Sequence, residues 1–380
     1  MPWPGPAHRC SPGARSPPGC SPPWPSPPRT ARHRPPCPSS CPPRRRPVSD
    51  PRPVRVLQSV LLGGAHLSYA DHVAGRLDPT RVQPLSFSYR TALTGRWDVL
   101  HVHWPENLVR HRSRPRRVLR TVLFALLLVR IRVLRPVVVR TVHNTTPHEG
   151  GRPVETALLG ALDRAVTWHV RLTDETPVRA GAAAVTIPHG HYRAELGDAG
   201  TPADPRCLLF FGYLRPYKGL DVLLTAFAGT TDPQLRLVVA GEPASAEMRS
   251  LVTDAAGADP RVTPHLGFVA DDALAALVGG SAVVVLPYRE IHNSGVVFAA
   301  LSLGRPVLVP ENPVTAALRA EVGEEWVRGF THPLTATDLT DALAAAAGRD
   351  PAATPDLAGR DWSTVAESYT GVFTSRPVAA

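Results

Sequence analysis

The second half of the chain alternates short apolar runs with amphipathic segments, and this pattern restricts the fold more than any other feature. The segments stand at 208–211, 235–240, 262–269, 273–278, 282–287, 296–303, 306–309 and 316–322. Such alternation produces a parallel sheet whose strands are joined by right-handed crossovers. Apolar runs in the first half, at 54–62, 98–104, 136–142 and 182–187, repeat the design. The sequence therefore predicts two α/β domains with a cleft between them.

The amino-terminal 50 residues differ from the rest in composition. They carry eight arginines against one acid, Asp50, and so hold most of the formal charge of +10. Proline is dense there and no periodic apolar face is present, so we predict a disordered tail over 1–52. Because the basic charge belongs mostly to this tail and is not interleaved with aromatic residues, nucleic acid is not expected as a partner.

A segment at 110–135 joins arginines to an apolar body. Its continuous apolar part, 121–129, is bracketed by Arg120 and Arg130 and is too short to span a bilayer. A helix lying on an anionic membrane surface and a core helix with a solvated basic end fit this pattern equally. No signal-peptide core precedes Pro53, so we expect a cytoplasmic protein, with peripheral attachment to the membrane's inner face left open.

The stretch FFGYLRPYKGLD, at 210–221, holds the only lysine of the chain, Lys218, among 42 basic residues. An apolar run breaks at Gly212 and continues as a short loop with Arg215 and Lys218 three residues apart. Open α/β sheets bind ligands at the ends of their strands, and both cations suit an anion such as a diphosphate. A solvated surface turn is the plainer interpretation of the same spacing.

A second informative stretch, at 286–310, places Ser294 and Gly295 before a predicted helix. Ser294 is a natural N-cap, and Gly295 allows a ligand to approach the first turn. The helix start offers free amides and a positive dipole end, so it predicts an anion site opposite Arg215 and Lys218. Ser-Gly before a helix is otherwise only a cap, and the prediction depends on the combination.

Three predicted strands of the first half lead into histidines, namely His103, His143 and His189. Histidines can bind metal, but no cysteine or pair of carboxylates completes a coordination shell here. We therefore expect these histidines to line a polar pocket for the acceptor, and we expect no metal site. Gly63 and Gly64 follow the first strand and form either an ordinary tight turn or a close backbone approach to a ligand.

Several segments together resemble a known family. FFGYLRPYKGLD, LVVAGE, HLGFV, LPYRE…SG and ALSLGRPVLVP look like the nucleotide-sugar half of GT-B glycosyltransferases, close to the large retaining group 1 family that includes bacterial mannosyltransferases. DVLHVHWPE, VVRTVHNTTPHE and VTIPHGHY are similar to its acceptor side. The resemblance implies an acceptor domain at 53–196, a linker at 197–206, a nucleotide-sugar domain at 207–358 and a helix at 359–375 that crosses back to the first domain.

The resemblance and the strand ends together predict the site. Donor-binding residues would be Gly212, Arg215, Lys218, Phe268, Val269, Glu290, Ser294 and Gly295. Acceptor-side residues would be Gly63, Gly64, His103, Trp104, Glu106, Asn144 and His189. Catalytic residues would be His143, Glu290, Lys218 and Arg215. By the family's pattern, Arg215 and Lys218 neutralise the leaving diphosphate, Glu290 contacts the sugar and His143 lies beside the reacting carbon.

One position departs from the family's pattern. Ala299 stands where the family has a glutamate that holds the donor ribose, and Glu290 matches the first family glutamate only with a shift of one residue. We expect the ribose contact to come from elsewhere, with Glu311 and Glu242 as candidates. The departure leaves open whether the anomeric configuration is retained or inverted, and inversion would require a general base, for which His143, Glu106 and Glu149 are the candidates.

These features predict a hexosyltransferase with GT-B architecture. It would move a hexose, with mannose from GDP-mannose as the first candidate and a UDP-linked donor also open, to a lipid-linked or saccharide acceptor in polysaccharide biosynthesis. Preorganised cations and amides suffice for a diphosphate leaving group, so no metal or other cofactor is expected. The alternative is a non-catalytic relative that binds a sugar nucleotide or glycan and lost turnover with the change at Ala299.

Overall fold

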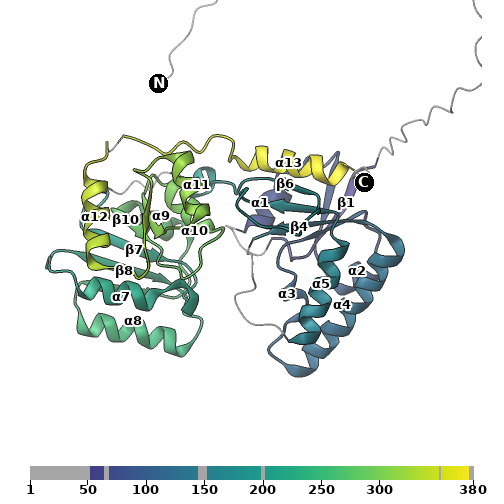
Figure 1. Ribbon diagram of the computed structural model, residues 1–380, viewed down its shortest axis with the longest axis horizontal. Helices are drawn as coiled ribbons and strands as arrows, with labels where there is room; N and C mark the ends of the chain where they lie inside the picture. The colour runs from purple at the N-terminus through teal and green to yellow at the C-terminus, as the bar shows by residue number, and fades with distance from the viewer. Residues whose placement is uncertain (1–51, 64–67, 144–151, 198–201, 351, 376–380) are drawn as a thin grey trace, which may run out of the picture. The chain divides into compact units, whose positions relative to one another are not determined.

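Two parallel sheets organise the part of the chain that the computed structural model describes, residues 52–63, 68–143, 152–197, 202–350 and 352–375 (Figure 1). Each sheet has six described strands. Their order is β2-β1-β3-β4-β5-β6 in the first sheet and β12-β11-β10-β7-β8-β9 in the second. All the strand pairs are parallel, which confirms the α/β class that the alternating pattern predicts.

The first sheet is buried on both faces. Its strands are β1 (Val54–Gln58), β2 (Val82–Leu85), β3 (Val99–Val102), β4 (Val137–Val142), β5 (Trp168–Arg171) and β6 (Ala184–Thr186). Its helices are α1 (Tyr69–Gly75), α2 (Tyr89–Thr94), α3 (Glu106–Val109), α4 (Arg114–Leu134), α5 (Pro153–Ala165) and α6 (Arg193–Leu196). Successive residues of β1, Val56 and Leu57, are fully buried in two separate clusters, one on each face.

Helices α2, α4 and α5 gather beside this sheet (Figure 1). The inner face of α4 contributes Phe124, Leu127 and Ile131, at the spacing of one helical stripe, to the cluster around Leu57. This part of the prediction of a core helix is confirmed, while the outer face of α4 is described below. No helix among the described residues has both the length and the apolarity needed to cross a membrane.

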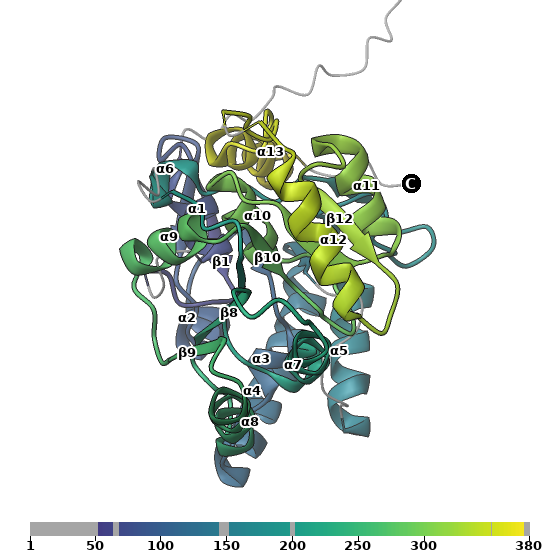
Figure 2. The same ribbon diagram turned by 90° about the vertical axis from the view of Figure 1, so that its left-hand side faces the viewer.

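The second sheet follows the predicted alternation closely. Its strands are β7 (Cys207–Phe211), β8 (Arg236–Gly241), β9 (Val262–Leu266), β10 (Val283–Val285), β11 (Val307–Pro310) and β12 (Val327–Phe330). Its helices are η1 (Pro216–Lys218), α7 (Leu220–Ala228), α8 (Ala246–Ala258), α9 (Asp271–Gly280), α10 (Gly295–Ser302), α11 (Pro313–Val322) and α12 (Ala336–Ala347). Figure 2 looks onto this part, where α12 packs against α7.

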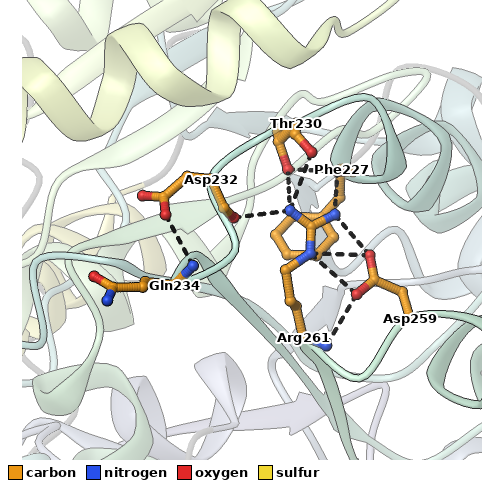
Figure 3. Close-up of polar contacts among 6 residues, drawn as sticks. All are labelled: Phe227, Thr230, Asp232, Gln234, Asp259 and Arg261. Carbon is orange, nitrogen blue, oxygen red and sulfur yellow. Dashed lines mark hydrogen bonds and ion pairs between the residues drawn. The ribbon is translucent and has the colours of Figure 1, made fainter.

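Arg261 joins several loops at the amino-terminal edge of the second sheet (Figure 3). Its guanidinium donates to the carboxylate of Asp259, to the carbonyls of Asp232 and Thr230 and to the Thr230 hydroxyl. It also lies 4.8 Å from the centre of the Phe227 ring. Because this network stands at the end of the strands away from the site described below, it stabilises the sheet without entering the chemistry.

The carboxyl-terminal helix α13 (Trp362–Thr374) returns to the first sheet, where it packs on α1 and against β1 and β4. The Tyr369 hydroxyl lies 3.0 Å from the Tyr69 hydroxyl and 2.6 Å from the Thr141 hydroxyl, and all three side chains are buried. The crossing helix that the resemblance implies is therefore present, beginning and ending slightly inside the predicted range 359–375.

Three strands escaped the sequence analysis, namely β2, β5 and β12. Each is four residues long, and β2 and β12 are edge strands. Pro84 in β2, His169 in β5 and Gly329 in β12 interrupt the apolar pattern that identifies a strand. The predicted strand at 54–62 is also shorter in the structure, since β1 ends at Gln58.

Candidate active site

A cavity of about 440 Å³ lies at the carboxyl ends of the strands and is lined by both halves of the chain. From the first half it is lined by Ser68, Tyr69, Trp104, His143, His189 and Tyr192. From the second half it is lined by Tyr217, Lys218, Tyr288, Glu290, Ile291, His292, Asn293, Ser294, Gly295 and Val296. Seven residues predicted from the sequence thus meet in one place: Trp104, His143, His189, Lys218, Glu290, Ser294 and Gly295.

Lys218 is the cation of this cavity. It ends the short helix η1 beyond β7, and only 7% of its surface is exposed. Its ammonium lies 5.1 Å from the centre of the Tyr288 ring, and no salt bridge between described residues includes it. Burial lowers the pKa of Lys218 to about 8, Tyr217 opposes this shift and Arg215 adds to it. A buried ammonium without a carboxylate partner is costly, so the arrangement suits an anionic ligand.

The loop that carries Lys218 is fixed against the loop after β10. The backbone amide of Arg289 donates to the carbonyl of Tyr217 at 3.0 Å. The guanidinium of Arg289 donates to the carboxylate of Asp221, in the first turn of α7, at 2.6 Å. These contacts hold Lys218 and Glu290 on neighbouring loops that face the same cavity.

The amino-terminal end of α10 is the second anion-binding element. Ser294 occupies the N-cap position, as predicted, but its side chain makes no capping hydrogen bond. Gly295 and Val296, in the first turn, line the cavity together with Lys218. A side chain at Gly295 would lie 3.2 Å from the Tyr192 hydroxyl. The absence of a side chain therefore leaves the free amides of this turn accessible to a ligand.

A cluster of buried histidines lies on the side of the cavity formed by the first half of the chain, where His143 lines it. His103 Nδ1 lies 3.1 Å from His143 Nε2, and His101 packs beside His103 with 4.2 Å between ring centres. Burial is the main cause that lowers the pKa of each: to about 3 for His103, and well below the usual value for His101 and His143. The cluster is therefore neutral at physiological pH.

His143 and His189 are held in place by aromatic stacking. The His143 ring stacks on Trp104 at 4.2 Å, and the His189 ring stacks on Phe298 of α10 at 4.9 Å. His189 Nδ1 donates to the carbonyl of Gly190, and burial lowers the pKa of His189 to about 4. Both imidazoles consequently present fixed, uncharged faces to the cavity that they line.

The loop before α10 touches the histidine strand directly. The side-chain amide of Asn293 donates to the carbonyl of His143 at 3.2 Å, and the His292 ring lies 3.0 Å from the Thr176 hydroxyl. Both residues also line the cavity. The strand end that carries His143 and the helix that presents free amides are thus linked by hydrogen bonds.

A smaller hollow of about 220 Å³ opens beside β7 and β8, lined by Phe211, Gly212, Tyr213, Ala240, Gly241, Glu242, Gly267, Phe268, Val269 and Leu274. Gly212 has φ +113°, and a side chain there would lie 2.9 Å from the ammonium of Lys218. The two hollows are therefore neighbours. Phe268 is 87% exposed on the rim, which leaves its ring free to stack on a planar group.

Other predicted residues lie outside the cavity. Arg215 is exposed, with its guanidinium 4.9 Å from the centre of the Tyr213 ring. Glu106 begins α3 and does not line the cavity, and Gly63 stands in a turn at φ +81° with its amide donating to Asp71. Gly64, Asn144 and Glu149 lie outside the described residues. For ribose binding, Glu311 is already held by Arg319 through two hydrogen bonds, whereas Glu242 lines the smaller hollow.

Sequence reasoning missed the tyrosines that line the cavity, Tyr69, Tyr192, Tyr217 and Tyr288. It also missed Gln58, whose side-chain oxygen lies 3.1 Å from His103 Nε2. An isolated tyrosine carries no sequence signal that separates a core position from a site. Gln58 did carry one, since it is a polar residue at the carboxyl end of β1, directly after the buried Val56 and Leu57.

Comparison with known proteins identifies the family. Residues 205–349 match the profile of the family described as Glycosyl transferases group 1. A protein of Xanthomonas campestris pv. campestris named GDP-mannose:glycolipid 4-beta-D-mannosyltransferase is 43% identical over 295 residues, which are 77% of this chain and 83% of the relative. This chain belongs to the group 1 glycosyltransferases. The predicted family and the prediction of a hexosyltransferase are confirmed, and the non-catalytic alternative gains no support.

Solved structures agree with this assignment of the fold. Anabaena HepE, in complex with UDP and glucose, matches with a TM-score of 0.53 and 15% identity, over 84% of this chain and 95% of that structure. An alpha,alpha-trehalose-phosphate synthase (UDP-forming) from Burkholderia xenovorans matches with a TM-score of 0.58 and 13% identity, over 85% of this chain and 100% of that structure. The GT-B architecture predicted from the sequence is therefore confirmed. Within the described residues, no group of three or more His, Cys, Asp or Glu side chains is arranged to bind a metal ion.

Proposed function

We propose that this glycosyltransferase transfers mannose from GDP-mannose to a lipid-linked sugar and forms a β-linkage. The observation that carries the proposal is the buried ammonium of Lys218, which has no carboxylate partner among the described residues and shares its cavity with the first turn of α10. Charge of this kind stabilises a diphosphate as it leaves. The choice of donor, acceptor and linkage follows the name of the Xanthomonas relative at 43% identity.

The donor would occupy both hollows. Its diphosphate would lie between Lys218 and the amides of α10, because this is where positive charge is concentrated. The nucleoside would extend past Gly212 into the smaller hollow, with Phe268 and Val269 against the base and Glu242 as the carboxylate nearest the ribose. The mannose would then lie between Glu290 and His143, which line the larger cavity.

The proposed linkage implies inversion. Mannose is α-linked to the diphosphate in GDP-mannose, so a β-product requires attack from the face opposite the leaving group. Such an attack needs a base on the acceptor side to take the hydroxyl proton. The positive charge at Lys218 and α10 would compensate the leaving GDP, so we propose that no metal ion or other cofactor is required.

A donor comparison tests this proposal. The purified full-length chain would be incubated with GDP-mannose, UDP-glucose or GDP-fucose and a polyprenyl-diphosphate-linked oligosaccharide, with and without EDTA. We expect transfer from GDP-mannose alone, unaffected by EDTA, and a β-anomeric signal in the NMR spectrum of the product. Transfer from a UDP-sugar, an α-product or loss of activity in EDTA would each refute the corresponding part.

The outer face of α4 suits a membrane-bound acceptor. Val118, Val122, Leu126, Val129 and Val133 recur every three or four residues and are each 50–71% exposed. This stripe adjoins an apolar hollow of about 580 Å³ between α4 and α5. Exposed arginines flank it, namely Arg114, Arg116, Arg132 and Arg135.

The combination of an unpartnered apolar stripe with flanking arginines fits the surface of an anionic membrane. We therefore propose peripheral attachment to the cytoplasmic face of the membrane, where a lipid-linked acceptor for polysaccharide synthesis would be reached. Arg120 and Arg130, which bracket the apolar segment in the sequence, are engaged elsewhere. Arg120 donates to the carbonyl of Arg110, and Arg130 donates to the carbonyl of Gly95.

Co-sedimentation with phosphatidylglycerol–phosphatidylcholine vesicles tests the attachment. The double variant Arg116→Glu/Arg132→Glu should reduce binding at least tenfold, because each basic residue near such a surface contributes about 1 kcal/mol. Arg249→Glu/Arg328→Glu, which makes the same charge change at exposed positions of the second half, is the control. Equal binding by both variants would show that α4 is not the contact.

A further inference from the structure

Three buried side chains form a single hydrogen-bonded line that ends at the cavity. Gln58 Oε1 lies 3.1 Å from His103 Nε2, and His103 Nδ1 lies 3.1 Å from His143 Nε2. Their exposures are 0%, 2% and 7%. The three residues end or follow the neighbouring strands β1, β3 and β4, so the sheet itself sets their spacing.

The direction of the hydrogen bonds fixes the protons. An amide oxygen only accepts, so His103 Nε2 carries the proton that Gln58 accepts. His103 Nδ1 is then bare and accepts from His143 Nε2–H. A neutral imidazole has one N–H, so His143 Nδ1 is bare as well. This nitrogen makes no hydrogen bond to described residues and is not among the fully buried nitrogens, so it is reachable from the cavity.

We propose that His143 is the general base of the transfer reaction, accepting the acceptor's proton at Nδ1, and that His103 and Gln58 are positioning residues that hold this nitrogen free. The inference rests on the proposed β-transfer, because only inversion requires such a base. Of the three candidates from the sequence, His143 lines the cavity and Glu106 does not, while Glu149 lies outside the described residues.

The transfer step forms one bond, breaks one bond and moves one proton. The acceptor oxygen forms a bond to C1 of mannose while the bond between C1 and the diphosphate oxygen breaks. The electron pair of the broken bond leaves with GDP, next to Lys218 and α10. The hydroxyl proton passes to His143 Nδ1, and the resulting imidazolium returns it to water when the products leave.

The surroundings of His143 explain why it would act only with the donor bound. In the free protein, burial is the main cause that lowers the pKa of His143, and the nearby His103 and His189 lower it further. Such a group is always unprotonated at neutral pH but is a weak base. The diphosphate of the donor brings negative charge into the same cavity, and a nearby negative charge favours the imidazolium. Donor binding therefore strengthens the base as the substrate arrives.

Kinetics of four variants test the roles. His143→Ala should lower kcat by roughly 10²- to 10⁴-fold, the usual contribution of a general base. His103→Leu, which removes the acceptor for Nε2–H, should lower kcat at least tenfold, and Gln58→Leu should have a smaller effect. His103→Asn, whose side-chain oxygen can replace Nδ1, should recover most of the activity. The KM for GDP-mannose should stay within about twofold throughout, since the contacts to the diphosphate are unchanged.

A spectroscopic measurement separates positioning from general disruption. In protein labelled with ¹⁵N-histidine, two-bond ¹H–¹⁵N correlations report which imidazole nitrogen carries the proton. The wild type should show His143 protonated at Nε2 and bare at Nδ1, and His103→Leu should mix the two tautomers. His143→Ala identifies the resonances by their loss.

The outcomes distinguish the proposed function from the role of His143. If the wild type does not use GDP-mannose, the proposed function fails first. If it does, a proton found on His143 Nδ1 in the wild type would overturn the inference, as would unchanged kcat in His103→Leu. The thermal midpoint shows whether His103→Leu folds. If it does not, the kcat values and the His143 tautomers of His103→Asn and Gln58→Leu still test the inference.

Discussion

The carboxyl ends of the two sheets differ in charge although they share one cavity. The first sheet presents imidazoles, His103, His143 and His189, whose pKa values burial lowers far below neutrality. The second presents a buried ammonium, Lys218, and the positive end of α10. One side can take up a proton, whereas the other can bind an anion.

This difference separates two requirements of glycosyl transfer. The leaving diphosphate needs fixed positive charge, and a hydroxyl nucleophile needs an uncharged proton acceptor. If the Lys218 ammonium lay directly beside His143, its positive charge would lower the pKa of the imidazole further. Placing the two on separate sheets lets each keep its own environment, and the substrate connects them.

The largest effect is expected from Lys218→Ala. Removing one group that stabilises the leaving charge should lower kcat by about 10²- to 10³-fold, or roughly 2.7–4 kcal/mol. The thermal midpoint should not fall, because the change also removes an ammonium that is buried without a carboxylate partner among the described residues. Arg249→Ala on α8 is the matched control for loss of a cation, and equal activity of the two variants would refute the role of Lys218.

A smaller loss is expected from Gly212→Ala. The new Cβ would lie 2.9 Å from the Lys218 ammonium, at a backbone φ of +113° that disfavours any side chain. Donor affinity should fall about tenfold, equivalent to about 1.4 kcal/mol. Gly257→Ala within α8, where a Cβ has open space, should leave affinity unchanged. Isothermal titration with GDP measures both variants.

The pH dependence of donor binding is the next prediction. The pKa of Lys218 is lowered to about 8, so the ammonium is mostly present at pH 7 and is lost as pH rises through 8. GDP affinity should therefore fall about fivefold between pH 8 and pH 9. Lys218→Arg, whose guanidinium stays charged, should remove this dependence. The imidazoles cannot cause it, since burial keeps His103 and His189 neutral well below this range.

The smallest effect concerns the scaffold of the histidine side. Tyr369→Phe removes hydrogen bonds to the buried hydroxyls of Tyr69 and Thr141. The free energy of unfolding should fall by about 1–2 kcal/mol, while kcat changes little. Ser368→Ala, at an exposed position of the same helix, is the control. A large loss of kcat without a loss of stability would place Tyr369 in the chemistry instead.

Much of the fold followed from the sequence because the long buried strands are continuous apolar runs. β7 and β8, both interior strands of the second sheet, were predicted nearly to their ends, while β2, β5 and β12 were missed. The missed strands are four residues long, and Pro84, His169 and Gly329 interrupt their apolar runs. The sequence therefore predicts a strand that is a continuous apolar run better than a short strand that a proline, histidine or glycine interrupts.

The site was predictable in part for a similar reason. His143 stands directly after a strand, Gly295 begins a helix and Lys218 lies in the short segment between β7 and α7, so sequence position alone predicts their placement near the strand ends. Arg215 is only three residues from Lys218, yet it points to the surface beside Tyr213. The sequence of a loop has no periodic pattern that would indicate the direction of each side chain. Contacts between distant segments, such as that of Gln58 with His103, also depend on the strand order, which the sequence did not provide.

Calorimetric titration of GDP into the wild type, Lys218→Ala and His143→Ala tests the division between the two sheets most directly. We expect His143→Ala to bind GDP as the wild type does and Lys218→Ala to bind it at least tenfold more weakly. If His143→Ala weakened GDP binding as much as Lys218→Ala, the histidine side would belong to the donor site, and the division of roles would be wrong.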